Sequence, residues 1–183
     1  MEQEIIIPKI NNKSTSIETK KFKPNSPRYE IINEEGCEIY TKANIGFGKV
    51  TFFNNSYFKI IESFYPNTHT RKKGVSFNNG SEFGTWYEFN KEGKLINEIN
   101  TDEGYDFGWL DVVKYCHKHD IQLEKGYPKS GGVKTEIYKN EEEGKKVWTI
   151  SYYKPKTDEY IEVTLDGQTG KEIKRRDLEF IGN

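Results

Sequence analysis

Hydrophobic and polar side chains alternate most regularly near the end of the chain, in the segment 160–165. Every second residue there is apolar, namely Ile161, Val163 and Leu165. This period of two is the signature of a β-strand with one buried face. The segment therefore predicts a strand of a sheet, and it carries no information about a reaction.

The residues on either side of this strand predict two further strands. Residues 147–153 are rich in β-branched and aromatic side chains, and 154–158 contain the proline and short polar residues that favour a turn. Residues 166–170 contain two glycines, which can adopt positive φ and let the chain return over 171–174. We expect a three-stranded antiparallel meander from 147 to 174.

Shorter strand-like runs fill the first half of the chain, separated by stretches rich in Asn, Gly and Ser that suit hairpin turns. The predicted strands are 29–32, 37–40, 48–53 and 57–64, followed by a hairpin over 84–89 and 94–99. Between these groups, 66–73 reads as a polar loop that ends in three basic residues, Arg71, Lys72 and Lys73. Such a cluster is more typical of a solvated loop than of a phosphate site.

One helix is predicted, near 106–121. Asp106 is placed to cap its first turn, and its apolar residues share one face because they recur at helical spacing: Trp109, Val112, Val113 and Cys116. The turn at 126–128 marks its end, and a flexible joint at 130–132 leads into a strand over 133–139.

These elements predict an α+β fold that is mostly antiparallel β-sheet, built from hairpins and a meander, with one main helix near 106–121 packed on the sheet. Residues 1–28 are expected to form a partly irregular N-terminal extension, in which Ile5–Ile7 is a possible edge strand. A single β-rich domain is expected over 29–183. Within it, 29–100 supplies the hairpins, and 105–183 supplies the helix and the last sheet.

Composition narrows the class of protein. Aromatic residues make up 14% of the chain against 33% for all hydrophobic residues, which favours a core of Tyr, Phe and Trp. Lys and Arg number 28 and Asp and Glu number 29, so no overall field collects nucleic acid or anionic lipid. We expect no nucleic-acid partner, and the short apolar runs predict no membrane span. Cys37 and Cys116 are far apart in sequence and are predicted to be free thiols, in a cytoplasmic protein or in the mature form of an exported one.

Candidate chemistry is sparse. Cys116 and His119 lie three residues apart on the predicted helix, as do His117 and Asp120, but no second ligand pair with zinc spacing accompanies them. The favoured interpretation places Cys116 inward and both histidines at the exposed end of the helix. No nucleophile motif and no phosphate-cradling glycine loop is present in the sequence. We expect neither a metal nor a cofactor, and a protein that is not an enzyme.

The stretch that most suggests partner binding is the loop before the predicted helix. Residues 101–109 concentrate acidic and aromatic side chains in a glycine-containing loop, and desolvated aromatics edged by charges make good interface anchors. The candidate partner-binding residues are Trp86, Asp102, Glu103, Tyr105 and Asp106. The alternative interpretation is structural: Asp106 caps the helix, Tyr105, Phe107 and Trp109 enter the core, and Asp102 and Glu103 are solvated.

The hairpin over 84–99 resembles one unit of the MORN-repeat-variant pattern, in which short hairpins repeat a glycine, an aromatic pair and a glycine turn. The residues that carry the resemblance are Gly84, Trp86, Tyr87, Phe89, Gly93 and Leu95. The pattern occurs in many bacterial antitoxin-like and immunity-like proteins. It covers about one tenth of the chain and is not repeated at a fixed period.

The last 75 or so residues are similar to a PepSY-like module, since a helix is followed by the strand-like runs 148–152 and 160–166 and by the turn from Asp166 to Lys171. In that family a helix packs on a three- or four-stranded antiparallel sheet. The resemblance implies an inhibitory or protein-binding domain without chemistry of its own.

The leading hypothesis from the sequence is a non-catalytic immunity protein, an antitoxin-like inhibitor that binds a cognate bacterial toxin or effector and occludes its active surface. One alternative is a PepSY-like regulatory or structural module that binds proteins, and another is a small enzyme or ligand-binding protein. An acidic patch facing a linked toxin favours the first, paired sheet edges in a homodimer favour the second, and a deep pocket with convergent polar groups favours the third.

Overall fold

The chain folds into two compact units, seen in a computed structural model that describes residues 5–127 and 134–178. The N-terminal unit comprises Met1–Asn78, Glu82–Thr101 and Lys125–Pro128. The C-terminal unit comprises Asn79–Ser81, Asp102–Glu124 and Lys129–Asn183. Each unit contains one antiparallel sheet. That the two together form a single domain over 29–183 stays a prediction.

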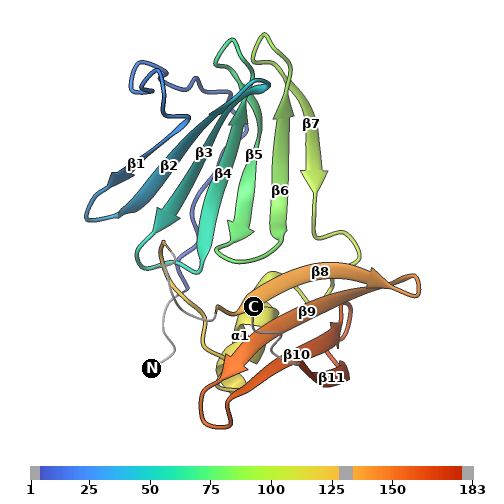
Figure 1. Ribbon diagram of the computed structural model, residues 1–183. Coiled ribbons are helices and arrows are strands. Elements are labelled where there is room, and N and C mark those ends of the chain that lie inside the picture. Colours follow the sequence, from blue (N-terminus) through green and yellow to red (C-terminus); the bar gives the residue numbers. More distant parts are fainter. Residues whose placement is uncertain (1–4, 128–133, 179–183) are drawn as a thin grey trace. The chain divides into compact units, whose positions relative to one another are not determined.

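The N-terminal unit is a seven-stranded meander, in which every strand pairs with its neighbours in sequence (Figure 1). All of these pairs are antiparallel. The predicted hairpins in the first half of the chain are therefore confirmed. The strands are β1 (Arg28–Ile32), β2 (Gly36–Ala43), β3 (Gly46–Phe53), β4 (Phe58–Phe64), β5 (Thr70–Phe77), β6 (Glu82–Phe89) and β7 (Leu95–Asn100).

Strand β5 corrects the prediction of a polar loop over 66–73. The basic residues from Arg71 to Lys73 lie in this strand, and Lys73 is only 4% exposed. Lys73 pairs across the sheet with Glu62, and its ammonium donates to the carbonyl of Lys13 at 2.6 Å. A cluster of charges usually indicates solvent exposure, but the opposite charge of Glu62 on the neighbouring strand and the carbonyl of Lys13 as an acceptor stabilise Lys73 within a strand here.

The turn between β6 and β7 is set by its own residues. The side-chain oxygen of Asn90 accepts hydrogen bonds from the backbone N–H groups of Glu92 at 3.1 Å and Lys94 at 2.9 Å. Gly93 follows with φ of 78°, which a residue with a side chain rarely adopts. These two features explain why the sequence predicts this hairpin correctly.

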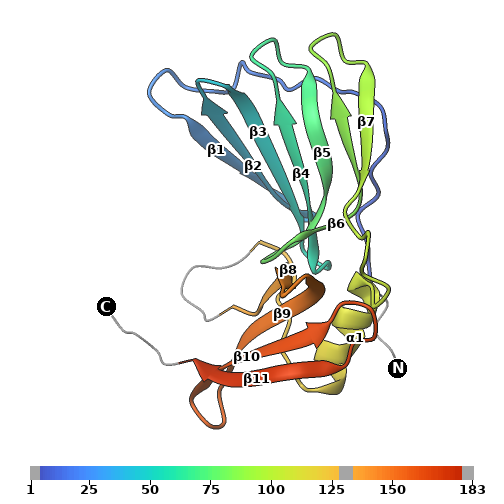
Figure 2. The same ribbon diagram turned by 90° about the vertical axis from the view of Figure 1, so that its right-hand side faces the viewer.

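An N-terminal strap, residues 5–22, crosses one face of the seven-stranded sheet (Figure 2). Thr15 and Thr70 exchange hydrogen bonds, because the backbone N–H of Thr15 donates to Oγ1 of Thr70 at 2.9 Å and that hydroxyl donates to the carbonyl of Thr15 at 3.0 Å. Further along, the Phe22 ring lies 5.5 Å from that of Phe47. The predicted edge strand at Ile5–Ile7 is wrong, since these residues are not in a strand and the carbonyl of Ile6 accepts from the Ser56 hydroxyl instead.

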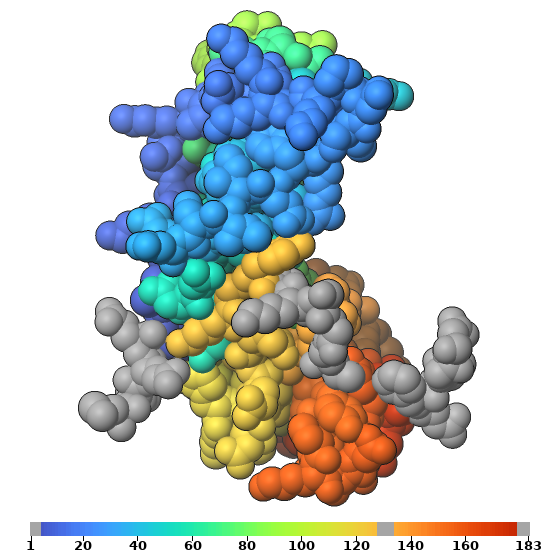
Figure 3. Space-filling model, turned by 60° about the vertical axis from the view of Figure 1, so that its left-hand side comes forward, coloured from blue at the N-terminus to red at the C-terminus, as the bar shows by residue number. Residues whose placement is uncertain are grey.

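We call the face crossed by the strap the strapped face, and the other the open face. In the space-filling view of Figure 3, the darkest blue atoms of the strap lie against the lighter blue of the first strands. The core of this unit is mainly aromatic, as the composition predicts. Its strapped face carries the buried rings of Phe58, Phe64, Phe77, Phe83 and Phe89.

The C-terminal unit is a four-stranded antiparallel sheet with a helix against one face (Figure 2). The meander predicted over 147–174 is present as three of its strands. Its core is mainly aliphatic and includes Val112, Ile137, Ile150, Val163 and Leu165 around the buried Trp148. The elements are α1 (Trp109–Lys118), β8 (Glu136–Glu142), β9 (Lys145–Lys154), β10 (Glu159–Asp166) and β11 (Glu172–Leu178), with the strands in the order β11-β10-β9-β8.

Helix α1 is shorter than the predicted 106–121 and is not capped by Asp106. Gly108 precedes its first residue, and the backbone N–H of Gly108 donates to the Asp111 carboxylate at 3.2 Å. A carboxylate inside the first turn therefore replaces the predicted cap, and it also suits the positive end of the helix dipole.

The buried face of α1 consists of Val112, Val113 and Cys116, as its spacing predicts, but Trp109, the fourth residue of the predicted face, is only half-buried. Cys37 and Cys116 are both free and buried, so the prediction of free thiols is confirmed. His117 and His119 are exposed at the end of the helix, as the favoured interpretation expects. Part of the predicted joint and strand start, 128–133, lies outside the described residues. Among the residues that are described, no helix is long and apolar enough to cross a membrane.

Candidate protein-binding surface

The open face of the seven-stranded sheet carries a row of apolar side chains that runs across the strands. Successive residues of the row are register partners or fill neighbouring positions on β2, β3, β4, β6 and β7. Four of the five are half-buried aliphatic residues, and the fifth is the buried Trp86. We call this row the apolar stripe; its members are Ile39, Val50, Ile61, Trp86 and Ile99.

Trp86 is fixed in the stripe by a gap in strand β5. A Cβ added to Gly74 would meet the indole ring at 2.0 Å, so only glycine lets the ring lie over this strand. The indole Nε1 donates to the carbonyl of Val75 at 3.1 Å, and the ammonium of Lys72 lies 4.8 Å from the ring centre. Trp86 is therefore 2% exposed and serves as the rigid base of the stripe.

Polar and charged residues border the stripe on one side. This border runs across the strands in the next row of register partners, in which Lys72 forms an ion pair with Glu82 at 3.5 Å. An apolar centre with a polar rim is the usual composition of a protein–protein interface. The border row is Thr41, Gly48, Ser63, Lys72, Glu88 and Asn97.

The other side of the stripe is closed by the segment that starts at Lys125. The Tyr127 ring lies 5.2 Å from that of Phe52, and the backbone N–H of Gly126 donates to the carbonyl of Ser56 at 3.0 Å. Phe52 and Cys37 are consequently buried. Within the described part of this unit, the four aliphatic residues of the stripe stay half-buried, whereas Phe52 beside that segment is buried.

The strapped face differs in its middle row, which holds charges. Lys49, Glu62 and Lys73 are successive register partners, and Lys49 forms an ion pair with Glu38 at 2.6 Å. Burial raises the pKa of the Glu62 carboxyl and lowers the pKa of the Lys73 ammonium, since burial disfavours the charged form of each. The strap lies against the Lys73 end of this row, where the carbonyl of Lys13 accepts from the Lys73 ammonium.

Four of the five partner-binding residues predicted from the sequence lie in the C-terminal unit, in the loop before α1. Glu103 and Asp106 are exposed there. Tyr105 is 9% exposed, and its hydroxyl donates to the carbonyl of Asn140 at 3.0 Å. Asp102 forms an ion pair with Lys139. The loop therefore offers two exposed carboxylates, while Tyr105 belongs to the core.

The ion pair of Asp102 is enclosed by aromatic rings. The ammonium of Lys139 lies 5.0 Å from the centre of the Tyr105 ring and 5.3 Å from that of Trp148, and its side chain is 9% exposed. A lysine held by a carboxylate and two ring faces fixes the loop to strands β8 and β9. This arrangement is structural, and it gives Asp102 and Tyr105 a role that their sequence pattern does not reveal.

Trp86, the fifth predicted residue, lies in the N-terminal unit, so the sequence-predicted set does not form one site within either unit. The residues that sequence reasoning missed are the aliphatic members of the stripe, above all Ile39, Val50 and Ile61. The available signal was an apolar residue at the centre of each of three neighbouring predicted strands, which an antiparallel register would align.

Across residues 5–127 and 134–178, no three His, Cys, Asp or Glu side chains lie together in a way that could hold a metal ion. Burial raises the pKa of the Cys116 thiol to about 12, which keeps it protonated and unreactive.

Comparison with known proteins adds no relative: no protein-family model matches the sequence, and neither a curated protein nor a solved structure matches this chain.

Proposed function

We propose that the protein is a non-catalytic inhibitor of the immunity-protein type, which binds a cognate toxin or effector protein and occludes its active surface. The observation that carries this proposal is the uncovered apolar stripe on a rigid antiparallel sheet. A sheet normally buries its apolar face against another layer, and the stripe has no such layer among the described residues of its own unit.

The dimensions of the stripe suit a protein partner. It extends across six strands, from β2 to β7, and therefore over roughly 24 Å at the usual strand spacing of about 4.8 Å. A standard interface buries roughly 800 Å² per partner, so the stripe would supply its apolar centre and the border row part of its polar rim. Glu103 and Asp106 remain exposed in the C-terminal unit and favour a cationic partner by steering it electrostatically.

The test begins with capture of partners on the tagged protein in its native host, followed by expression of each partner in a susceptible strain. The proposal requires one partner that is lethal alone and harmless when the inhibitor is co-expressed. Ile61→Lys places a charge in the centre of the stripe and should abolish protection. Ile173→Lys, at an isoleucine that is 53% exposed on β11, is the matched control and should retain it. A partner that is harmless alone, or protection that survives Ile61→Lys, would overturn the proposal.

A PepSY-like regulatory or structural module is the second candidate, and one observation favours it. In the C-terminal unit a helix lies against a four-stranded antiparallel sheet, which is the arrangement that family would have. On this alternative, the C-terminal unit binds the partner, so Ile61→Lys leaves binding intact and changes at Glu103 and Asp106 weaken it.

A further inference from the structure

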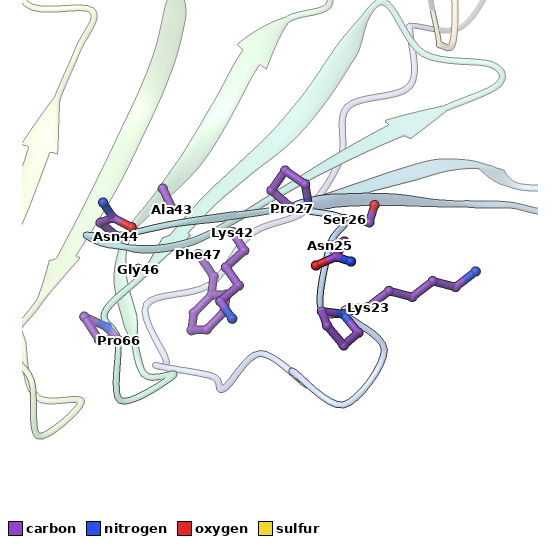
Figure 4. A pocket seen from close by; sticks show the side chains of 11 residues that line it. Lys23, Asn25, Ser26, Pro27, Lys42, Ala43, Asn44, Gly46, Phe47 and Pro66 are labelled. Carbon is purple, nitrogen blue, oxygen red and sulfur yellow. The ribbon is translucent and has the colours of Figure 1, made fainter.

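A pocket of about 550 Å³ opens at one end of the seven-stranded sheet (Figure 4). Its walls come from three segments: the loop 23–27 before β1, the hairpin turn 42–47 between β2 and β3, and Pro66 after β4. A volume of this size is typical of small-molecule sites. We propose that this pocket binds a small aromatic carboxylate.

The floor of the pocket is a cross-strand pair. Lys42 and Phe47 are register partners in the β2–β3 hairpin, so their side chains project from the same face of the sheet. Phe47 is half-buried and packs against Phe22 at 5.5 Å between ring centres. An aromatic ring and an ammonium therefore lie beside each other at the base of one cavity.

The walls are held in place by the chain itself. The backbone N–H of Lys42 donates to the carbonyl of Pro27 at 2.7 Å, and the Ser26 hydroxyl donates to the carbonyl of Arg28 at 2.7 Å. Pro24, Pro27 and Pro66 contribute rigid apolar surfaces without N–H donors. The cavity is therefore preformed, which lowers the ordering cost of binding a ligand.

Charge selects the class of ligand. Two lysines and no acidic residue line the pocket. Among residues 5–127 and 134–178, no carboxylate lies within ion-pair distance of Lys23 or Lys42. Figure 4 shows the side chain of Lys23 extending away from the other lining side chains, which leaves Lys42 as the cation of the floor. The Lys42 ammonium would pair with a carboxylate of the ligand, and the Phe47 ring beside it would pack against an aromatic group of the same ligand.

The pocket and the apolar stripe lie on opposite faces of the sheet, because Lys42 and Phe47 project from the strapped face and the stripe lies on the open face. Toxin neutralisation can fail while the pocket still binds its ligand, and the reverse also holds.

The test uses three probes with the full-length protein, followed through backbone amide signals in two-dimensional NMR. Phenylacetate carries both ring and charge, phenylacetamide keeps the ring without the charge, and acetate keeps the charge without the ring. Phenylacetate should move the signals of Gly46 and Phe47 saturably. Phenylacetamide should bind about fivefold more weakly, the size expected of one solvent-open ion pair. Acetate should also bind at least about fivefold more weakly, because it lacks the ring that packs on apolar surface.

Two variants test whether Lys42 is the cation that binds the carboxylate. Lys42→Met keeps most of the apolar stem and should weaken phenylacetate by about fivefold, to the level of phenylacetamide. Lys174→Met, at an exposed lysine on β11, is the control and should change nothing. Acetate binding as tightly as phenylacetate would mean an adventitious ion only, and phenylacetamide binding equally would remove the role of Lys42. Shifts confined to residues outside the pocket, or no shift at all, would also overturn the proposal.

Discussion

The two faces of the seven-stranded sheet both carry apolar side chains, but only one of them is covered by another part of the chain. The strapped face buries aromatic rings such as Phe58 and Phe83 and is crossed by a charged row that the chain covers with its own N-terminus. The open face presents half-buried aliphatic residues and leaves them uncovered within its unit. In this sheet, a core therefore differs from a candidate binding surface in being covered by the N-terminal strap, and not in its content of apolar residues. The following predictions test that distinction.

The largest effect is expected on the strapped face. Phe58 is fully buried, and its ring lies 5.3 Å from that of Phe77 and 4.8 Å from that of Phe83. Phe58→Ala should reduce the free energy of unfolding by about 3–5 kcal/mol, because it removes apolar contacts and leaves a cavity. Urea unfolding monitored by circular dichroism measures this. A loss below about 1 kcal/mol would show that the strapped face is not a core.

Removing an anchor of the strap should have an intermediate effect. Thr70 is fully buried, and its hydroxyl both accepts from the N–H of Thr15 and donates to the carbonyl of Thr15. Thr70→Val keeps the volume and leaves the N–H of Thr15 unpaired, while the carbonyl of Thr15 still accepts from the backbone N–H of Thr70 at 3.0 Å. We therefore expect a loss of about 2 kcal/mol. Amide hydrogen exchange at Thr15 and Ile17 should accelerate. Strand β9 serves as the control, because exchange there should accelerate only by the amount that the loss of global stability explains. Unchanged exchange at Thr15 would contradict the role given to Thr70.

Ile61 lies in the same strand as Phe58 but on the open face, which makes it the matched comparison. Because it is already half-exposed, Ile61→Ala should reduce the free energy of unfolding by only about 1 kcal/mol. The same urea titration measures this. A loss as large as that of Phe58→Ala would mean that the open face is also a closed core.

The smallest effect concerns pH. Burial raises the pKa of Glu62 in the folded chain, so its favourable contribution is complete below the unfolded pKa and is lost as pH rises through the folded pKa. Glu62→Gln should therefore be more stable than the parent protein at neutral pH, and this advantage should shrink on acidification. Thermal unfolding of both proteins at several pH values provides the measurement. A variant that is less stable at neutral pH would show that Lys49 and Lys73 outweigh the cost of burial.

The sequence predicted the strands well and their faces poorly. In β4 both sets of alternate residues mix apolar and charged side chains, since Phe58, Ile60 and Glu62 face one way and Lys59 and Ile61 the other. Periodicity locates such a strand but does not identify the covered side. Which side is covered depends on the strap, and the strap contacts sheet residues that lie some 60 positions later in the sequence.

The candidate site was only partly predictable for the same reason. Trp86 was chosen for its chemistry, and the structure shows that its position depends on Gly74, which lies on another strand. The sequence pattern predicts Asp102 and Tyr105 as partner-binding residues, yet Lys139 forms an ion pair with Asp102 and lies over the ring of Tyr105. The partner of each lies far along the chain, beyond the reach of local pattern.

The segments of the two units alternate along the sequence, and this limits how recombination can divide the gene. Asn79–Ser81, which joins β5 to β6, bonds to Ile137 of β8, and the segment from Lys125 to Tyr127 completes the N-terminal unit after α1. No single cut in the gene therefore separates the two units with both of them whole. Recombination that shuffles compact modules between genes should pass this pair on together, and inserted sequence should be tolerated at exposed hairpin tips such as Glu143 rather than between the units.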